Sequence, residues 1–119
     1  MTRKSELGKL GEDLACRYLK KKGYKVIERN YLKPWGELDI VTISPEKILV
    51  LVEVKTVRGP KPEVAAEDQV TRAKLIKFRR AAELYANGGN LLTDKGWRID
   101  LVTVTIGGDK AEVKHYENI

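Results

Sequence analysis

The chain has 119 residues, 42% of them hydrophobic and 34% charged, and its formal net charge is +6. This size and composition predict one globular domain over residues 1–119 and exclude an intrinsically disordered chain. The lone cysteine, Cys16, excludes an internal disulfide, and with the lone histidine, His115, it excludes a Cys/His zinc site and disfavours a Ser-His-Asp triad. The longest apolar run, Ile48–Val52, is far shorter than a membrane helix, so we expect a cytoplasmic protein without a membrane partner.

The first predicted element is a helix over residues 5–22, which Gly23 ends. Its apolar stripe recurs at spacings of three and four: Leu7, Leu10, Leu14 and Tyr18. Apolar, strand-forming runs between turn residues then predict five strands: Tyr24–Tyr31, Glu37–Ile43, Ile48–Val57, Trp97–Ile106 and Lys110–Tyr116. Residues 33–36 form a predicted turn, 44–47 a short connection and 58–62 a loop.

A second helix is predicted over residues 66–86, before a stop at residues 87–90. One face of it carries Val70, Ala73, Lys77, Ala81 and Leu84. The resulting order, α-β-β-β-α-β-β, predicts an α/β fold with a mixed central sheet of about five strands flanked by helices.

Three charges lie within apolar, strand-forming segments: Asp39 in residues 36–41, and Glu53 with Lys55 in residues 51–56. A charge in a buried strand costs several kcal/mol unless it is paired or binds a metal. Because side chains alternate along a strand, Glu53 and Lys55 share a face, and a hairpin of the two segments would bring Asp39 to Glu53. Carboxylates with a backbone carbonyl suit Mg²⁺ or Mn²⁺, and the alternative is an ordinary cross-strand salt bridge.

A third acid, Glu12, lies at the edge of the apolar stripe of the first helix, beside Gly8 and Ala15. Gly8 and Gly11 both lower helix propensity, which is easier to understand if the sheet or a ligand packs closely there. Glu12 would then reach the strand carboxylates. The alternative is a solvated side chain beside glycines that ease helix packing.

These motifs resemble those of the PD-(D/E)XK nuclease superfamily, with Asp39 as the first acid and Glu53-Val54-Lys55 as the second motif. More closely, the chain resembles the uncharacterised bacterial YraN-like family, which is similar to archaeal Holliday junction resolvases. The matching segments are Gly8–Glu12, the Asn30 region, Gly36–Val41, Val52–Thr56 and Arg98–Val102. The resemblance implies a single restriction-endonuclease-like domain in which Glu12, Asp39 and Glu53 surround Mg²⁺ or Mn²⁺ and Lys55 assists the attacking water.

The function expected from this resemblance is metal-dependent cleavage of DNA, with branched or distorted DNA as a candidate substrate. The alternatives are a non-catalytic nucleic-acid-binding module on the same fold, and an adaptor protein whose acids form salt bridges. A resolvase-like enzyme that cuts two strands symmetrically would need a two-fold homodimer. The net charge of +6 favours a polyanionic partner over a merely soluble basic protein.

Basic residues are spread over several segments, and most of them are expected to be solvated surface. The candidates for phosphate contact are Arg3, Lys4, Lys9, Arg58, Lys61, Arg72, Lys74, Lys77, Arg79 and Arg80. Gln69 and Lys74 follow the lysine motif at a distance that would place the second helix beside the site. Tyr31 and Trp35 flank the turn before Asp39 and are candidates for stacking on an unpaired base, although simple packing is the commoner role of such aromatics. Asp100, beside Arg98, is predicted to form a structural ion pair.

Overall fold

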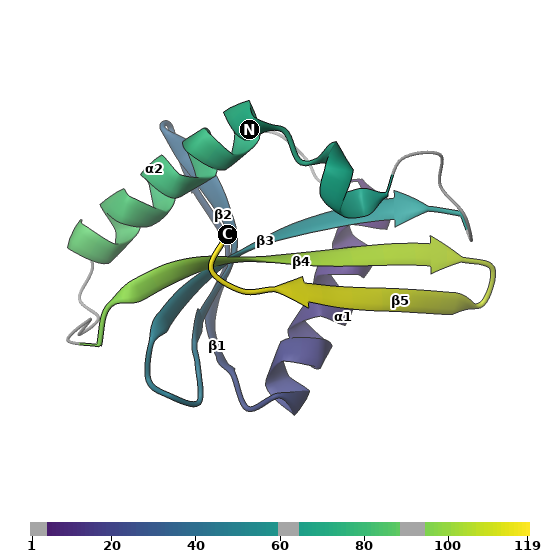
Figure 1. Ribbon diagram of the computed structural model, residues 1–119, viewed down its shortest axis with the longest axis horizontal. Coiled ribbons are helices and arrows are strands. Elements are labelled where there is room, and N and C mark those ends of the chain that lie inside the picture. Colours follow the sequence, from purple (N-terminus) through teal and green to yellow (C-terminus); the bar gives the residue numbers. More distant parts are fainter. Residues whose placement is uncertain (1–4, 60–64, 89–94) are drawn as a thin grey trace.

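The computed structural model describes residues 5–59, 65–88 and 95–119 (Figure 1). The elements follow the predicted order, with a short 3₁₀ turn before the second helix. They are α1 (Glu6–Lys21), β1 (Lys25–Lys33), β2 (Gly36–Ile43), β3 (Leu49–Arg58), η1 (Ala66–Gln69), α2 (Arg72–Gly88), β4 (Trp97–Gly107) and β5 (Lys110–Tyr116). The predicted α/β class and the order of the elements are therefore confirmed.

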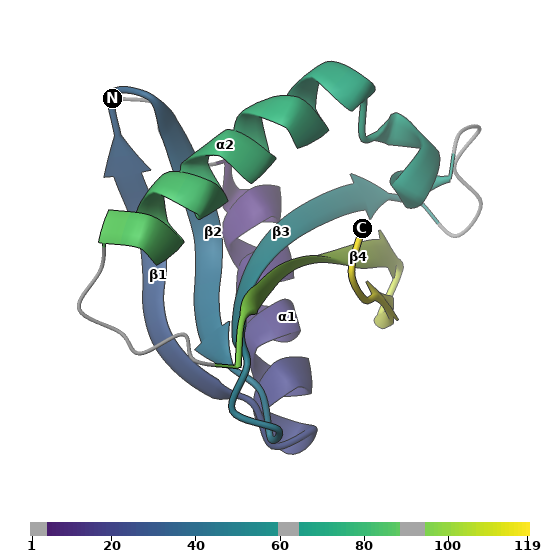
Figure 2. The ribbon, with the colours of Figure 1, turned by 60° about the vertical axis from the view of Figure 1, so that its left-hand side comes forward.

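One five-stranded sheet, in the order β1-β2-β3-β4-β5, forms the middle layer of the molecule. Only the β3–β4 pair is parallel, and the crossover between these strands runs through η1 and α2. Helix α1 covers one face of the sheet and α2 the other, as the two ribbon views show (Figures 1 and 2). Each helix thereby buries its own apolar cluster against the sheet.

Helix α1 begins where the Ser5 hydroxyl accepts a hydrogen bond from the Gly8 N–H at 3.0 Å, an N-cap that satisfies one of the first free donors. Its buried face differs from the predicted stripe, because Leu10 is 47% exposed whereas Gly11 and Ala15 are buried. The small residues allow close approach to the sheet: a Cβ on Gly11 would lie 1.8 Å from Thr56 Oγ1. Close packing, rather than the largest apolar side chains, decides which face is buried.

Helix α2 begins at Arg72, six residues later than predicted. Val70 is extended, and the Thr71 hydroxyl accepts the Lys74 N–H at 3.2 Å, as an N-cap does. The predicted apolar face is right at Ala81, which is buried, but wrong at Leu84, which is 46% exposed. The buried positions of this helix are Phe78, Ala81, Ala82 and Ala86.

Strands β2 and β3 separate in the middle of the sheet, at a place that we call the fork. Their pairing runs from Ile43–Leu49 to Ile40–Val52 and stops there, one residue before Asp39 and Glu53. Beyond the fork, β2 stays with β1 as one arm, and β3 stays with β4 as the other. The two arms diverge in Figure 2, with α1 behind the fork and α2 crossing in front of it.

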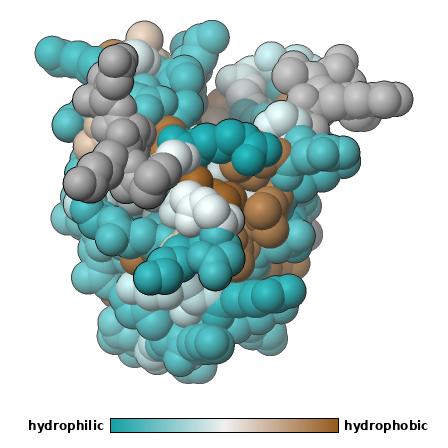
Figure 3. All heavy atoms as spheres, turned by 90° about the vertical axis from the view of Figure 1, so that its right-hand side faces the viewer, coloured by the Kyte–Doolittle hydropathy of each residue, from teal (hydrophilic) through white to brown (hydrophobic). Residues whose placement is uncertain are grey.

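The surface at the far end of the β3–β4 arm is mostly hydrophilic, with a hydrophobic area near its middle (Figure 3).

Cys16 is a free, buried thiol on α1, and its burial raises its pKa, which disfavours the nucleophilic thiolate. Neither of the two described helices combines the length and apolar character required to span a membrane.

Candidate functional site

Asp39 lies at the first position of β2 beyond the fork, where its carboxylate takes over the role of a backbone carbonyl. Oδ2 accepts a hydrogen bond from the Val54 N–H at 2.8 Å. Ile40–Val52 is the last backbone pair of these two strands, so the side chain continues the contact after the ladder ends. Asp39 is thereby fixed against the Glu53–Lys55 segment, as the sequence predicted for a β2–β3 hairpin.

Glu53 and Lys55 flank Val54 on β3 and are both half-buried. Val52 and Val54 pack on the α1 side of the sheet, so strand alternation places Glu53 and Lys55 at the opposite positions. Val54, Lys55 and Thr56 also line a cavity of about 260 Å³ beside the first turn of α1.

Glu12 lies on the buried face of α1 and is only 1% exposed. Its Oε1 accepts hydrogen bonds from Arg29 Nε at 3.1 Å and from Asn30 Nδ2 at 2.9 Å, both on β1. Arg29 also binds Asp13 at 2.7 Å, which completes a small network between the helix and the first strand. Glu12 is therefore held behind the fork by β1.

Asn30 and Arg29 are the residues of this site to which sequence reasoning gave no role. Asn30 has a left-handed backbone, with φ at 53°, and this conformation interrupts the alternation of β1. Arg29 and Asn30 consequently both reach Glu12, while Glu28 and Tyr31 both contact Tyr85 on the α2 side. Only the match of the Asn30 region to a known family pointed here, because strand periodicity carries no signal for such an interruption.

The interruption extends to β2, whose side chains also depart from simple alternation. Alternation would place Leu38 and Ile40 on one side of the strand. In the structure Leu38 packs with Phe78 under α2, whereas Ile40 packs in the α1 cluster. Asp39 lies between these two positions, where the strand changes face.

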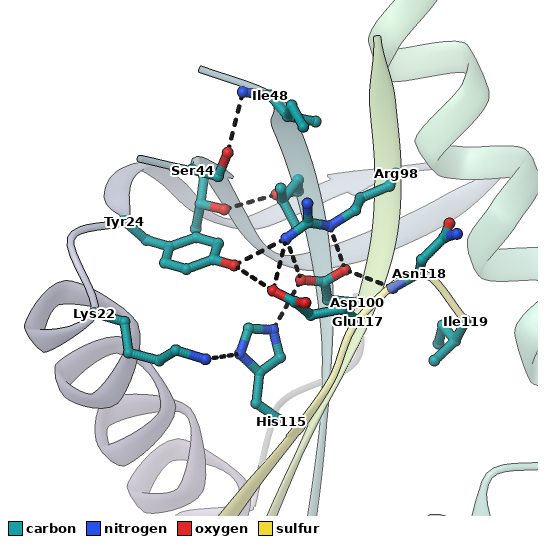
Figure 4. A network of polar contacts seen from close by, with 12 residues as sticks. Lys22, Tyr24, Ser44, Ile48, Arg98, Asp100, His115, Glu117, Asn118 and Ile119 are labelled. Carbon is teal, nitrogen blue, oxygen red and sulfur yellow. Dashed lines mark hydrogen bonds and ion pairs between the residues drawn. The ribbon is translucent and has the colours of Figure 1, made fainter. Parts of the chain in front are cut away.

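A second group of charged and polar side chains lies around Asp100 on β4, and we call it the Asp100 cluster (Figure 4). Asp100 is fully buried, and its Oδ1 accepts hydrogen bonds from Arg98 Nε at 2.9 Å and from the Asn118 N–H at 2.9 Å. Its other oxygen, Oδ2, lies 2.8 Å from His115 Nε2. Burial disfavours its charged form, but the hydrogen bonds from His115 and Arg98 outweigh burial and lower the pKa of the carboxyl group. The predicted ion pair between Asp100 and Arg98 is confirmed.

The ligand atoms of Asp100, His115 and Glu117 all lie within 4.8 Å of one another, which is close enough for a shared metal ion. The Arg98 guanidinium already holds a positive charge there, with Nη2 at 3.2 Å from Glu117 Oε1. Lys22 Nζ lies 3.0 Å from His115 Nδ1, and because an ammonium only donates, that nitrogen accepts and Nε2 carries the proton toward Asp100. The cluster therefore fits an internal ion-pair network better than a metal centre.

The basic candidates lie on several sides of the molecule. Lys9 and Arg58 are exposed on α1 and β3, and the remaining described ones are exposed on α2: Arg72, Lys74, Lys77, Arg79 and Arg80. Arg79 Nη2 donates to the Ile119 carbonyl at 2.6 Å, and Gln69 lies in η1. Arg3, Lys4 and Lys61 lie outside the described residues.

The fold and the fork define an α/β domain with a candidate centre of carboxylates and one lysine. The sequence model of Uncharacterised protein family UPF0102 matches residues 11–104. A UPF0102 protein of Syntrophomonas wolfei is 38% identical to the chain, over 95% of the chain and 96% of the relative. A UPF0102 protein of Syntrophotalea carbinolica is 41% identical, over 92% of the chain and 87% of the relative. A UPF0102 protein of Fervidobacterium nodosum is 36% identical over 92% of the chain and 78% of the relative. The chain belongs to the UPF0102 family, which confirms the resemblance to the YraN-like proteins.

Proposed function

We propose that this protein is a metal-dependent endonuclease of the PD-(D/E)XK superfamily that hydrolyses phosphodiester bonds in DNA. The observation that supports this most directly is the hydrogen bond from Val54 to Asp39. It fixes the first acid beside the segment that carries Glu53 and Lys55, at the point where the strands part. The site thus lies where paired strands end and two separate arms begin.

The chemistry of the donor set fits Mg²⁺ or Mn²⁺. Asp39, Glu53 and the Val54 carbonyl offer hard oxygen ligands, which these ions prefer. Glu12 would complete the set directly or through a water molecule. When bound, such an ion polarises a phosphate oxygen and lowers the pKa of a coordinated water.

The remaining chemistry falls to the protein. Lys55 stabilises negative charge as it develops on the phosphate, or orients the attacking water, from its position two residues beyond Glu53. Arg29 and Asn30 fix the orientation of the Glu12 carboxylate, so it needs little rearrangement to act as a ligand. The similarity to archaeal Holliday junction resolvases suggests branched DNA as a substrate and a two-fold dimer as the active form.

The net charge of +6 and the basic α2 also suit a nucleic-acid-binding module without catalysis. Such a module gains nothing from carboxylates that face phosphate, so the acids at the fork favour the enzyme. The alternative is tested in the same experiment as the nuclease.

The test is incubation of the purified protein with Mg²⁺ or Mn²⁺ and a panel of duplex, single-stranded and four-way-junction DNA. We expect metal-dependent cleavage of at least one substrate, lost in Asp39→Asn and Glu53→Gln and retained in Asp109→Asn, a control in the exposed β4–β5 turn. Salt-sensitive binding without cleavage by the wild type would establish the binding module instead. Cleavage that survives both fork variants would belong to another site.

A further inference from the structure

The tip of the β1–β2 hairpin, on the arm that carries Asp39, exposes large apolar side chains. Trp35 is 49% exposed and Leu32 is 45% exposed. Lys33 Nζ, on the same tip, lies 5.3 Å from the centre of the Tyr31 ring. An exposed indole beside lysines is unusual for plain surface, since an aromatic ring of this size is normally buried to a large extent.

Helix α2 contacts both strands of this hairpin close to its tip. Tyr31 packs edge-on against Tyr85 of α2, with ring centres 4.9 Å apart. On the other strand, a Cβ added to Gly36 would lie 2.9 Å from Ala81 Cβ, so the helix touches the strand backbone there. Trp35 precedes Asp39 by four residues, about 13 Å along an extended strand.

A line of lysines on α2 runs beside the same arm. Residues three or four apart share a helix face, so Lys74, Lys77 and Ala81 form one stripe. Ala81 touches Gly36, which places this stripe on the edge of α2 nearest the hairpin. Both lysines are exposed. Figure 2 shows α2 crossing in front of the fork, so the stripe lies on the helix that covers this face of the sheet.

We propose that this surface, made of Trp35, Lys74 and Lys77, binds a nucleic-acid strand that carries an unpaired base. Trp35 stacks on the base, and the two lysines contact the phosphates on the way to the fork. The inference rests on the proposed function and adds a substrate class to it: DNA with unpaired nucleotides close to the scissile phosphate, in preference to a perfect duplex.

Charge complementarity favours this occupant over a protein partner. The core of a protein–protein interface is depleted of lysine, whereas here Lys33 is exposed on the same hairpin tip as the indole, and Lys74 and Lys77 are exposed on the helix that touches the hairpin. Every base has a flat face for stacking and every nucleotide adds a phosphate, so an alternating apolar and cationic surface suits a single strand without sequence preference.

Binding is measured without metal, by the fluorescence anisotropy of labelled DNA at several salt concentrations. Three probes of equal length are compared: a single strand, a duplex and a duplex with an unpaired bulge. Trp35→Ala is expected to weaken binding of the single strand and the bulged probe about tenfold, the cost of one lost stacking contact. Binding of the perfect duplex should change by less than about twofold. Trp35→Phe keeps a stacking ring and should restore most of the affinity, and Ile76→Ala, which removes an exposed apolar side chain elsewhere on α2, should bind like the wild type.

The lysines have a different signature. Lys74→Gln and Lys77→Gln should weaken all three probes, and each should reduce the slope of log affinity against log salt for the single strand by about 0.7. Lys110→Gln is the matched control, because Lys110 is exposed at the start of β5, outside α2 and the β1–β2 hairpin, and should leave the slope unchanged.

The two proposals fail separately. Wild-type protein that binds these probes but never cleaves DNA would refute the nuclease and leave this surface standing. Trp35→Ala protein that binds all three probes like the wild type, or that loses duplex binding equally, would overturn the stacking surface even if cleavage at the fork is observed.

Discussion

The fork and the Asp100 cluster both place acids inside strands of one sheet, yet they are built in different ways. At the Asp100 cluster the β4–β5 pairing ends one residue away, at Leu101–Tyr116, but Arg98 and His115 lie against the carboxylate and hold it from within. At the fork the strands part, Asp39 accepts a backbone N–H, and a cavity opens beside Lys55. In the first case buried charge supports the fold, and in the second we infer that it supports chemistry.

This comparison also shows what a sequence can reveal about charged residues in strands. Asp39 and Asp100 both lie in apolar strand segments. Arg98, two residues from Asp100 on the same face, made the ion pair predictable. The separation of β2 from β3 at Asp39 could not be predicted from the sequence, because the point where strand pairing ends depends on how the two arms twist apart.

Replacement of Asp100 should have the largest effect on stability. Asp100→Asn leaves the Arg98 guanidinium, whose side chain is only 16% exposed, without its main counter-charge. Loss of one partner of a buried pair typically lowers the free energy of unfolding by about 3–5 kcal/mol. Asp39→Asn should change it by less than about 1 kcal/mol, because it relieves repulsion among neighbouring carboxylates. Urea unfolding of both variants checks this, and equal losses would remove the distinction between the two regions.

The same pair of variants gives a pH signature. The pKa of Asp100 is lowered in the folded protein, so its contribution to stability is present above the ordinary Asp value of 3.8 and is lost as the pH falls through the lowered value. The stability advantage of the wild type over Asp100→Asn should therefore be constant near neutral pH and should shrink below about pH 4.

Replacement of Lys55 should affect cleavage rather than stability. Loss of one group that stabilises charge in a transition state costs about 10²- to 10³-fold in rate. We expect a reduction of this size in Lys55→Gln, with Mn²⁺ binding preserved, because the lysine is not a ligand. The control is Lys110→Gln, because Lys110 is an exposed residue at the start of β5 and lies outside the fork. Equal losses in the two variants would point to general attraction of DNA in place of a role at the fork.

Gly11 tests the packing that brings Glu12 to the fork. An alanine there should favour the helix by about 1 kcal/mol, yet its Cβ would overlap Thr56. Overpacking of this kind costs about 1–3 kcal/mol, so Gly11→Ala should lower the midpoint of thermal unfolding. Gly88→Ala, where the added Cβ meets nothing within 4 Å, should not lower it. A more stable Gly11→Ala protein would mean that α1 lies farther from β3 than described.

The smallest predicted effect concerns Tyr24 in the Asp100 cluster. Burial raises the pKa of Tyr24 to about 12, against a lowering by Arg98 and with smaller increases from Asp100 and Glu117. A phenol whose pKa is raised in the folded state contributes fully below pH 10 and loses that contribution as the pH rises toward 12. Between pH 8 and pH 11 the free energy of unfolding of the wild type, measured in urea, should fall by about 1 kcal/mol relative to that of Tyr24→Phe. Around pH 8 the difference between the two proteins should stay constant. A pH-independent difference would place Tyr24 in a more solvated environment.

The order of the elements could be predicted because each is bounded by clear signals, such as Gly23 after α1 and the turn before Gly36. The start of α2 was misplaced although Thr71 carries an N-cap signal, since residues 66–70 also suit a helix. The buried face of α1 was misjudged because large apolar residues outweighed small ones in the periodicity. Asn30 could not be assigned from the residues alone, because its role depends on a positive φ that any strand propensity argues against.

The central claim, that the fork and not the Asp100 cluster is the metal centre, is tested most directly by calorimetric titration with Mn²⁺. The wild type, Asp39→Asn and Glu117→Gln are compared, and the Glu117 side chain, at 56% exposure, can be changed without disturbing the core. We predict one binding site in the wild type and in Glu117→Gln, and none in Asp39→Asn. Binding that is lost in Glu117→Gln and kept in Asp39→Asn would contradict the account.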